Sequence, residues 1–286
     1  MKRLLVPTDF SPASEDALKL ASSIADKSGA EIYLVNFTEH PFDESFTTTG
    51  DMRAKFDDEE TLFTVQLIRR NNERLQALAT KYTEGRVINI QVYGQDLVDG
   101  VEEYVHDKNI DLIVMGTTGE ETAREFFTGN HTEQIIEKAT VPVLSLRSGQ
   151  ENVNFENVVV GIELDSDSKD NFRAATQHLN AFAAAMSSKL HLVHISKPGD
   201  KNRDEVEAQI HSFAKKFNIE NYTSNLHYSD DIEDGLTRFA RLNEAGIIAV
   251  LSHAEGGFFR IFSSSVSEEL SKESEVPVLS INLHNV

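Results

Sequence analysis

Cysteine is absent from the 286 residues of the sequence. Disulfide bonds, thiolate zinc sites and cysteine nucleophiles are therefore all excluded. Long apolar runs are also missing, because no segment approaches the roughly 20 apolar residues of a membrane-spanning helix. The segment MKRLLVPTDF at the start carries an apolar run of only about five residues, which is too short for a signal peptide. We therefore expect a cytoplasmic protein with no membrane partner.

Positive charge is scarce as well. The sequence has 27 lysines and arginines against 47 aspartates and glutamates, a formal net charge of -20. Nucleic acids and anionic membranes bind clusters of Lys and Arg, so neither is an expected partner. A local anion site is still compatible with this charge, because backbone N–H groups at a helix N-terminus bind phosphate unaided. The 40% hydrophobic and 26% charged residues are typical of a folded globular protein.

The sequence repeats itself once along its length. The segment YGQDLVDGVEEY, which starts at Tyr93, resembles YSDDIEDGLTRF, which starts at Tyr228. The segment VPVLSLR, from Val141, resembles VPVLSIN, from Val276. Both pairs have the same offset of 135 residues (228 − 93 and 276 − 141). We therefore predict a tandem duplication, since a chain of this length holds two domains of ordinary size.

Each half alternates apolar strands with helices. The first half contains the apolar segments RLLVPT, IYLVNF, VINIQVY, LIVM and VPVLSL. Helices are predicted between them, from the cap Ser11 to Gly29 and over 61–82, 97–106 and 132–139. Apolar strands separated by helices predict a parallel sheet covered on both faces. We place the domains at 1–147 and 155–286, joined by a polar linker at 148–154.

A loop that contains several glycines follows the fourth strand of the first half. Gly116, Gly119 and Gly129 punctuate the segment MGTTGEETAREFFTGNHTEQII, and a polar triplet then opens a helix. Glycine lets the backbone approach an anion closely, and the free N–H groups of a helix N-terminus attract phosphate. Open parallel sheets bind ligands at the carboxyl ends of their strands, where this loop and Asp9 both lie. The pattern therefore predicts a phosphate site.

The same residues also have structural interpretations. Asn130 is equally a helix cap, with Glu133 completing a pair like a capping box. His131 is either a phosphate contact or an exposed side chain in the first turn. Arg124 either folds over a triphosphate or, as we slightly favour, is a solvated surface charge. The sequence leaves these alternatives open.

Both halves resemble universal stress protein domains, and the chain resembles the tandem members of that family. The segment VPTDFSPASEDAL has the strand-to-helix turn of the family with its acidic residue. Gly116, Gly119 and Gly129 reproduce the glycine spacing of the family. The resemblance covers nearly the whole chain except an insertion from His40 to Glu60. One departure is Asn130, which stands where the family has Ser or Thr.

The resemblance implies two tandem Rossmann-like, adenine nucleotide alpha hydrolase-like domains, each a parallel five-stranded sheet flanked by helices. It implies ATP, with or without Mg²⁺, at the ends of the first and fourth strands, with Asp9 near the nucleoside and Phe37 lining the adenine pocket. The two halves would pack like the subunits of a homodimer, through their last strands. The residues expected at the nucleotide are Pro7, Thr8, Asp9, Phe37, Met115, Gly116, Gly119, Arg124, Gly129, Asn130, His131 and Thr132.

The second half has lost the glycine pattern. At the positions of Gly116, Gly119, Gly129 and Asp9 it carries Leu251, Ala254, Ser264 and Glu163. A Cβ atom at each glycine position would crowd phosphate groups, so we expect a degenerate site that supports the first half. A surviving anion nest is the alternative for the small residues of this region, Gly256, Gly257 and Ser263 to Ser265.

Catalytic signatures are missing. The sequence has no Walker-type loop, no dinucleotide fingerprint and no hydrolase nucleophile elbow. His191 and His194 are three apart on a predicted strand, so they point to opposite faces and cannot share a metal ion. We see no clear general base or magnesium carboxylate cluster, and expect at most a slow ATPase through Asp9 or a bound metal.

Two hypotheses about function follow. The first is an ATP-binding regulator or protectant in the stress response, with the nucleotide in the N-terminal half. The alternative is a protein-interaction module with a vestigial glycine loop, which Asn130 and the degenerate second half favour. A homodimer of whole chains is compatible with both hypotheses.

Overall fold

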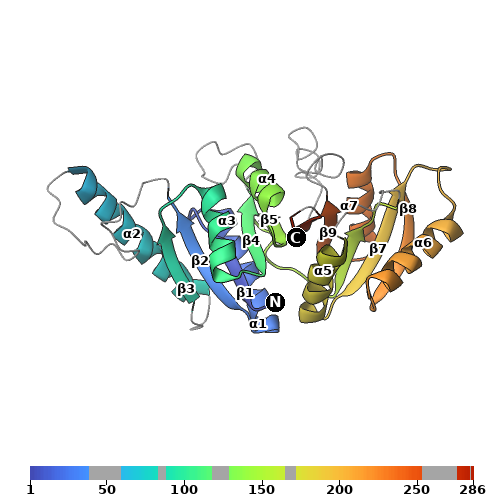
Figure 1. Ribbon diagram of the computed structural model, residues 1–286, viewed down its shortest axis with the longest axis horizontal. Coiled ribbons are helices and arrows are strands. Elements are labelled where there is room, and N and C mark those ends of the chain that lie inside the picture. The colour runs from blue at the N-terminus through green and yellow to red at the C-terminus, as the bar shows by residue number, and fades with distance from the viewer. Residues whose placement is uncertain (39–58, 83–87, 118–128, 165–171, 253–275, 284) are drawn as a thin grey trace.

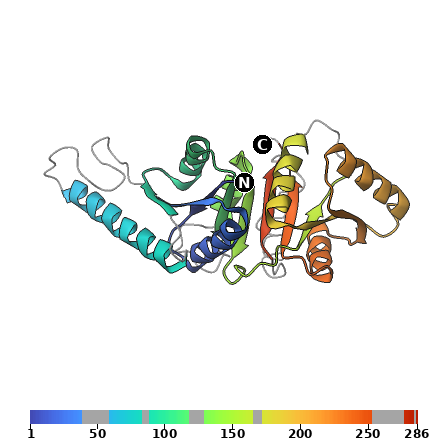
Figure 2. The ribbon, with the colours of Figure 1, turned by 90° about the horizontal axis from the view of Figure 1, so that it is seen from below.

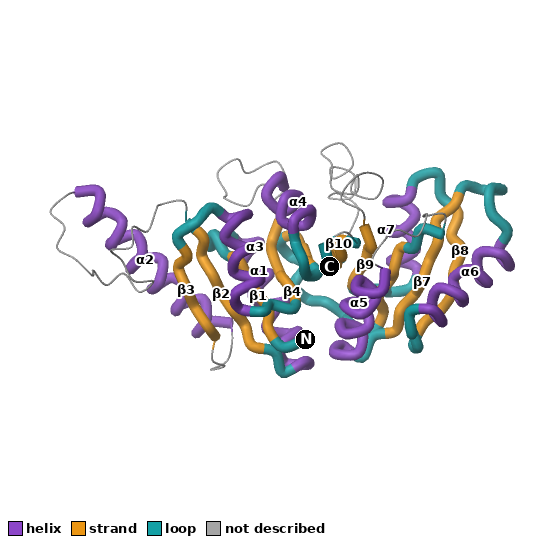
Figure 3. Tube along the Cα trace, in the orientation of Figure 1, coloured by secondary structure: helices purple, strands orange, loops and turns teal. Residues whose placement is uncertain are grey.

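The computed structural model describes residues 1–38, 59–82, 88–117, 129–164, 172–252, 276–283 and 285–286. Within these residues ten strands form one continuous sheet, and seven helices pack on its two faces (Figures 1 and 3). The predicted α/β fold with two repeated domains is confirmed. In the described part of the chain, no helix combines the length and the apolar character that crossing a membrane requires.

The first half contributes five strands and four helices. Its strands are β1 (Arg3–Pro7), β2 (Glu31–Phe37), β3 (Ile88–Tyr93), β4 (Leu112–Thr117) and β5 (Val143–Arg147). Its helices are α1 (Pro12–Ser28), α2 (Glu59–Tyr82), α3 (Leu97–Lys108) and α4 (Gly129–Lys138).

The second half repeats this order. Its strands are β6 (Asn157–Gly161), β7 (Lys189–Ser196), β8 (Tyr222–Tyr228), β9 (Ile247–Ser252) and β10 (Val278–Asn282). Its described helices are α5 (Phe172–Met186), α6 (Arg203–Lys216) and α7 (Ile232–Leu242).

The strand order across the sheet is β3-β2-β1-β4-β5-β10-β9-β6-β7-β8. Neighbouring strands are parallel within each half. The exception is the central pair, in which β5 and β10 run antiparallel and Leu144 faces Leu279. The two halves therefore join through their last strands, and both chain ends lie near this junction (Figure 1).

Among the described residues, the hydrophobic core crosses the junction on one face of the sheet. There, α1, α2, α5 and α6 cover one continuous cluster, and α1 contacts α5, its counterpart in the other half. On the opposite face, the apolar residues under α3 and α4 form a cluster separate from that under α7. The sheet twists strongly, so Figure 2 shows α1 and α6 on opposite sides of the molecule.

Local sequence signals explain most of the helix ends. The Ser11 side chain accepts a hydrogen bond from the amide of Ser14 and caps α1, as predicted, and Gly29 ends that helix in the left-handed conformation. The start of α4 differs from the prediction of Thr132, because the helix begins at Gly129. The first N–H groups of a helix have no acceptor within it, so those at the start of α4 are left for other partners. The backbone of Asn130 therefore lies within the first turn of α4.

Candidate functional site

The candidate site lies where β1 and β4, which are neighbours in the sheet, reach their carboxyl ends. From β1 the chain passes into α1, which packs on the face with the continuous core. From β4 the chain leads toward α4, which packs on the opposite face. A crevice at such a divergence is the usual ligand site of an open parallel sheet.

The turn after β1 is built from buried hydrogen bonds. Thr8 is only 1% exposed, and its hydroxyl lies 2.9 Å from the hydroxyl of Ser14 in α1. The amide of Phe10 donates to the same Thr8 hydroxyl at 3.0 Å. Phe10 has a φ of 67°, a left-handed conformation that a bulky residue rarely adopts. The turn is therefore held in one shape, and uncommon backbone angles of this kind cluster at functional sites.

Asp9 presents one unused carboxylate oxygen. Its Oδ1 accepts a hydrogen bond from the amide of Ser11 at 3.0 Å. Its Oδ2 is buried and finds no hydrogen-bond partner in the described part of the chain. Buried polar atoms are nearly always paired, so this oxygen is available to a donor group from a ligand.

Gly116 is required by the packing of α1 against β4. A Cβ atom at this position would lie 2.3 Å from the carbonyl carbon of Ala13 and 2.7 Å from the amide nitrogen of Ser14. The first turn of α1 therefore rests directly on the end of β4. In the second half the corresponding residue is Leu251, whose side chain is buried in the core.

The first turn of α4 carries a second unpaired polar atom. Thr132 is 2% exposed, and its Oγ1 has no hydrogen-bond partner among the described residues. Met115, a fully buried residue of β4, lies in one apolar cluster with Ile135 and Ile136 of the helix. These contacts hold α4 against β4, while His131 is half-exposed. The structure thus places Asp9 directly after β1, Gly116 in β4 and Thr132 on α4, which packs against β4.

Some predicted site residues cannot be placed in this way. Gly119 and Arg124 lie outside the described residues, as does most of the insertion from His40 to Glu60. Gly129 and Asn130 lie in the first turn of α4. Pro7 ends β1, where it is buried and pairs with Val35 of β2.

Phe37 is buried under α3. It is 4% exposed, and its ring centroid lies 5.7 Å from that of Tyr93 and 6.2 Å from that of Tyr104. Gly100 of α3 lies against the ring, because a Cβ there would come within 2.6 Å of it. Burial, followed by a hydrogen bond with Glu103, raises the pKa of Tyr93 to about 12, so this hydroxyl stays protonated at neutral pH.

Arg74 is a cation beside the site that the sequence did not reveal. Its guanidinium carbon lies 3.8 Å from the centroid of the Phe10 ring, a stacked geometry. Partial burial and then Arg70 lower the pKa of Arg74, while Asp9 and Glu15 act in the opposite direction. In the sequence alone Arg74 resembles an ordinary surface charge, because it lies far from Asp9 on a helix with several other exposed cations.

Two buried amides connect α2 to the same turn. The Nδ2 atom of Asn71 donates to Oδ1 of Asn36 at 2.8 Å, and Nδ2 of Asn36 donates to the carbonyl of Thr8 at 2.7 Å. Both side chains are less than a tenth exposed. This chain of hydrogen bonds fixes α2, and hence Arg74, relative to the end of β1.

The second half keeps the scaffold but changes the chemistry. His194 occupies the place of Asn36, and its Nδ1 lies 3.0 Å from the carbonyl oxygen of Ile162, the counterpart of Thr8. Glu163, at the position of Asp9, is exposed. His191 bonds Asn157 and Thr223, so the two histidines have separate partners. The positions 254, 256, 257 and 263–265 lie outside the described residues.

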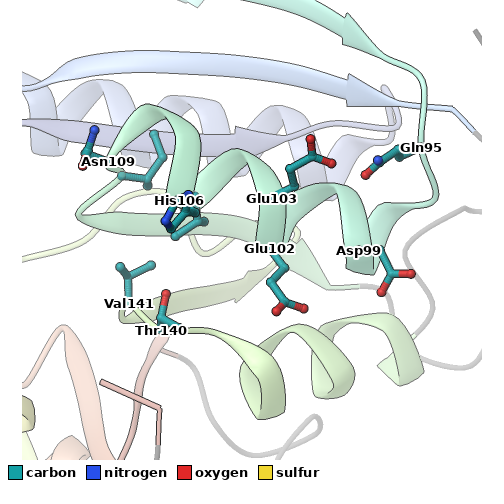
Figure 4. Close-up of a pocket in the computed structure, with 10 residues that line it drawn as sticks. Gln95, Asp99, Glu102, Glu103, His106, Asn109, Thr140 and Val141 are labelled. Atoms are coloured by element: carbon teal, nitrogen blue, oxygen red, sulfur yellow. The ribbon is translucent and has the colours of Figure 1, made fainter.

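A surface groove lies away from this crevice, along α3 and the connection from α4 to β5. It has a volume of about 610 Å³. Figure 4 shows acidic side chains of α3 lining it, with Glu102 extending toward α4. An acidic lining repels phosphate, so this groove does not suit a nucleotide. The lining includes Asp99, Glu102, Glu103, His106 and Thr140.

Comparison with known proteins gives one consistent picture. The model of the universal stress protein family matches residues 1–147 and again residues 154–282. A universal stress protein of Methanocaldococcus jannaschii is 29% identical over 152 residues, which are 51% of this chain and 82% of that protein.

Two solved structures share the fold over nearly the whole chain. The crystal structure of a universal stress protein from Archaeoglobus fulgidus has a TM-score of 0.65 at 18% identity, covering 98% of this chain and 96% of that one. A putative universal stress protein from Pseudomonas aeruginosa has a TM-score of 0.60 at 13% identity, covering 99% and 93%.

Proposed function

The chain belongs to the universal stress protein family, with two copies of the family's domain in tandem, and from that premise we propose that it is a cytoplasmic, ATP-binding regulator or protectant in the stress response. The nucleotide occupies the N-terminal half. One observation carries this proposal: two buried polar atoms, Oδ2 of Asp9 after β1 and Oγ1 of Thr132 on α4, lack partners among the described residues. A nucleotide supplies donors for the first and acceptors for the second.

The residues of the crevice fit the parts of ATP. The carboxylate of Asp9 accepts hydrogen bonds from the ribose hydroxyls. The N–H groups in the first turn of α4 and the Thr132 hydroxyl donate to phosphate oxygens, where the helix dipole favours negative charge. Arg74, stacked on Phe10, adds a positive charge near the carboxylate. Gly119, Arg124, Gly129, Asn130 and His131 belong to the proposed contact set through the family motif.

Rapid hydrolysis is not part of the proposal. One oxygen of Asp9 is engaged by the Ser11 amide, and the described residues contain no group of three His, Asp or Glu side chains arranged to hold a metal ion. Mg²⁺ would reach the site together with the phosphates of the nucleotide. Phosphoryl transfer requires a positioned base and metal carboxylates, so we propose slow turnover at most.

The second half serves as a support. We infer that the domains span 1–147 and 155–286 and that their pairing through β5 and β10 replaces the contact between two subunits. Leu251 and Glu163, in place of Gly116 and Asp9, make this half unsuited to the same ligand. The chain carries one nucleotide, with no role for nucleic acid or membranes.

Thermal unfolding with a panel of ligands tests this function. A ligand at a hundred times its Kd stabilises the folded state by about 2.7 kcal/mol. We expect ATP with Mg²⁺ to raise Tm by several degrees, and inorganic phosphate at the same concentration to have little effect. If no adenine nucleotide raises Tm at millimolar concentration, the proposal fails and the interaction-module alternative takes its place.

A further inference from the structure

The last turn of α4 is held by residues of the second half. The Nδ2 atom of Asn282, at the end of β10, lies 2.7 Å from the carbonyl oxygen of Glu137 and 3.5 Å from that of Ile136. The Nδ2 atom of Asn285 lies 2.6 Å from the same Glu137 oxygen. Asn282 is 2% exposed, so its contact is made inside the protein.

These bonds provide partners for carbonyl groups at the C-terminal end of α4. The last four carbonyl groups of a helix have no partner within it. In α4 the amide of Ala139 bonds the carbonyl of Ile135 at 2.8 Å. The next two carbonyls, those of Ile136 and Glu137, receive the asparagine amides. The second half therefore completes a helix of the first half.

The other end of the same helix opens at the candidate site. Helix α4 spans only Gly129–Lys138, ten residues, and so behaves as a short rod about 15 Å long. Its middle is seated on β4 through Ile135 and Ile136, which share a cluster with Met115. A displacement of its last turn therefore displaces the N–H groups and the Thr132 hydroxyl of its first.

We propose that Asn282, assisted by Asn285, is a positioning residue for the nucleotide site of the first half. It sets the orientation of α4 from the far end, without touching the ligand. This inference rests on the proposed function and assigns the second half a specific task in it. Residue 147, its counterpart in the repeat, is an arginine, so the asparagine cap is not shared by both halves.

Three variants test the proposal by calorimetric titration with ATP and Mg²⁺. Asn282→Ala removes the donor, and Asn282→Asp keeps the shape but sets a carboxylate against the two carbonyls. The matched control is Asn180→Ala, whose Nδ2 lies 3.2 Å from the carbonyl of Phe217 and 3.3 Å from that of Asn218, beyond the end of α6. It removes a similar helix-end contact far from α4.

We expect Asn282→Ala to weaken ATP binding about five- to tenfold, an effect within the range of coupling through packed elements. Asn282→Asp should weaken it further, because it replaces attraction with repulsion. Asn180→Ala should keep wild-type affinity even where it lowers Tm equally. Wild-type affinity in both Asn282 variants would overturn the proposal and leave the proposed function intact.

Coupling between two sites acts in both directions, which gives a readout that a merely structural contact would not move. Saturating ATP should slow hydrogen exchange at the C-terminal residues, where the amide of Val286 bonds the carbonyl of Asn282 at 3.4 Å. If ATP binds the wild type without slowing this exchange, the proposal is wrong.

Hydrogen exchange measured on the ligand-free protein tests the role of Asn282 independently of whether the protein binds a nucleotide. If the wild type binds no nucleotide, the proposed function fails by itself. The role of Asn282 is then judged by hydrogen exchange at the amides of residues 132–138. Faster exchange in Asn282→Ala than in Asn180→Ala supports the positioning role, and equal exchange overturns it.

Discussion

Leu144 faces Leu279 across the antiparallel pair that joins the two halves, and the two residues are one repeat spacing apart (279 − 144 = 135). The flanking pairs are Ser145 with Val278 and Val143 with Ser280. In the repeat, Ser145 corresponds to Ser280 and Val143 to Val278, so each pair is the counterpart of the other. The approximate two-fold axis between the halves therefore passes through this leucine pair. A symmetric contact of this kind is the type that joins two identical subunits, and here it lies within one chain.

Because Gly116 is closely packed against α1, we predict that a larger residue at this position destabilises the protein. In Gly116→Ala the new Cβ would lie 2.3 Å from the backbone of Ala13, so α1 must move. We expect a loss of stability of about 1–3 kcal/mol, typical of overpacking, together with weaker ATP binding. Urea unfolding and titration measure the two effects.

The control is Gly235→Ala, which meets the Cγ2 atom of Ile195 at 2.7 Å in the second half. It should reduce stability but leave ATP affinity unchanged. Wild-type stability in Gly116→Ala would show that α1 does not rest on β4 as described.

Replacing Thr132 should have opposite effects on the stability of the protein and on its affinity for ATP. Its hydroxyl is buried without a partner in the part of the chain that the structure describes. Thr132→Val removes this unpaired group at nearly constant volume, so the ligand-free protein should be as stable as the wild type or up to about 1 kcal/mol more stable. ATP affinity should fall about tenfold, because a bond to the ligand is lost.

The matched control is Thr237→Val, since Thr237 of α7 is also buried with an unpaired Oγ1. Its effect on stability should be similar, and its effect on ATP binding absent. Equal ATP affinity in both variants would remove Thr132 from the site.

Arg74 should act through its charge. Arg74→Gln removes the guanidinium that stacks on Phe10, and we expect ATP to bind about three- to tenfold more weakly at low ionic strength. The difference should shrink near 0.5 M salt, because the Debye length falls to a few ångströms. The control is Arg238→Gln, whose arginine pairs with Asp234 at 2.6 Å in the second half. A deficit that does not change with salt would contradict an electrostatic role.

Asp16 of α1 accepts hydrogen bonds from Ser148 and Gly149 of the linker and makes the stability of the protein depend on pH. Burial favours the neutral acid, but hydrogen bonds from Lys19, Gly149 and Ser148 outweigh it and hold the pKa of Asp16 below its ordinary value. A lowered pKa contributes stability above the ordinary value near 4, and this contribution is lost as the pH falls through the lowered one. The wild type should therefore exceed Asp16→Asn in urea stability at pH 7. The gap should close near pH 3; a gap that stays constant would exclude this charge effect.

Several features of the fold are readable from the sequence because their causes are local. Ser11 before a proline and Gly29 after an apolar face determine where α1 begins and ends. The meeting of the last strands has no such local signal, and only the resemblance to tandem universal stress proteins implies it. The sequence predicts the start of α4 at Thr132, three residues later than observed, because Asn130 resembles a cap although its backbone lies in the first turn.

The missed residues depend on contacts between distant segments. Arg74 and Asn71 reach the β1 turn only because α2 packs against β2 and β3. Asn282 reaches α4 only because β10 pairs with β5. The spacing of residues along the sequence gives no sign of these contacts between distant segments. Gly116 was attributed to a ligand alone, whereas the backbone of α1 also requires it.

The most direct test of the account is the stoichiometry of ATP binding. Nucleotide-free protein is titrated with ATP and Mg²⁺ in a calorimeter, beside the Gly129→Val variant with its fold checked by circular dichroism. We predict one molecule bound per chain in the wild type and none in the variant. Two molecules per chain, or one that survives Gly129→Val, would contradict a single nucleotide site at the first turn of α4.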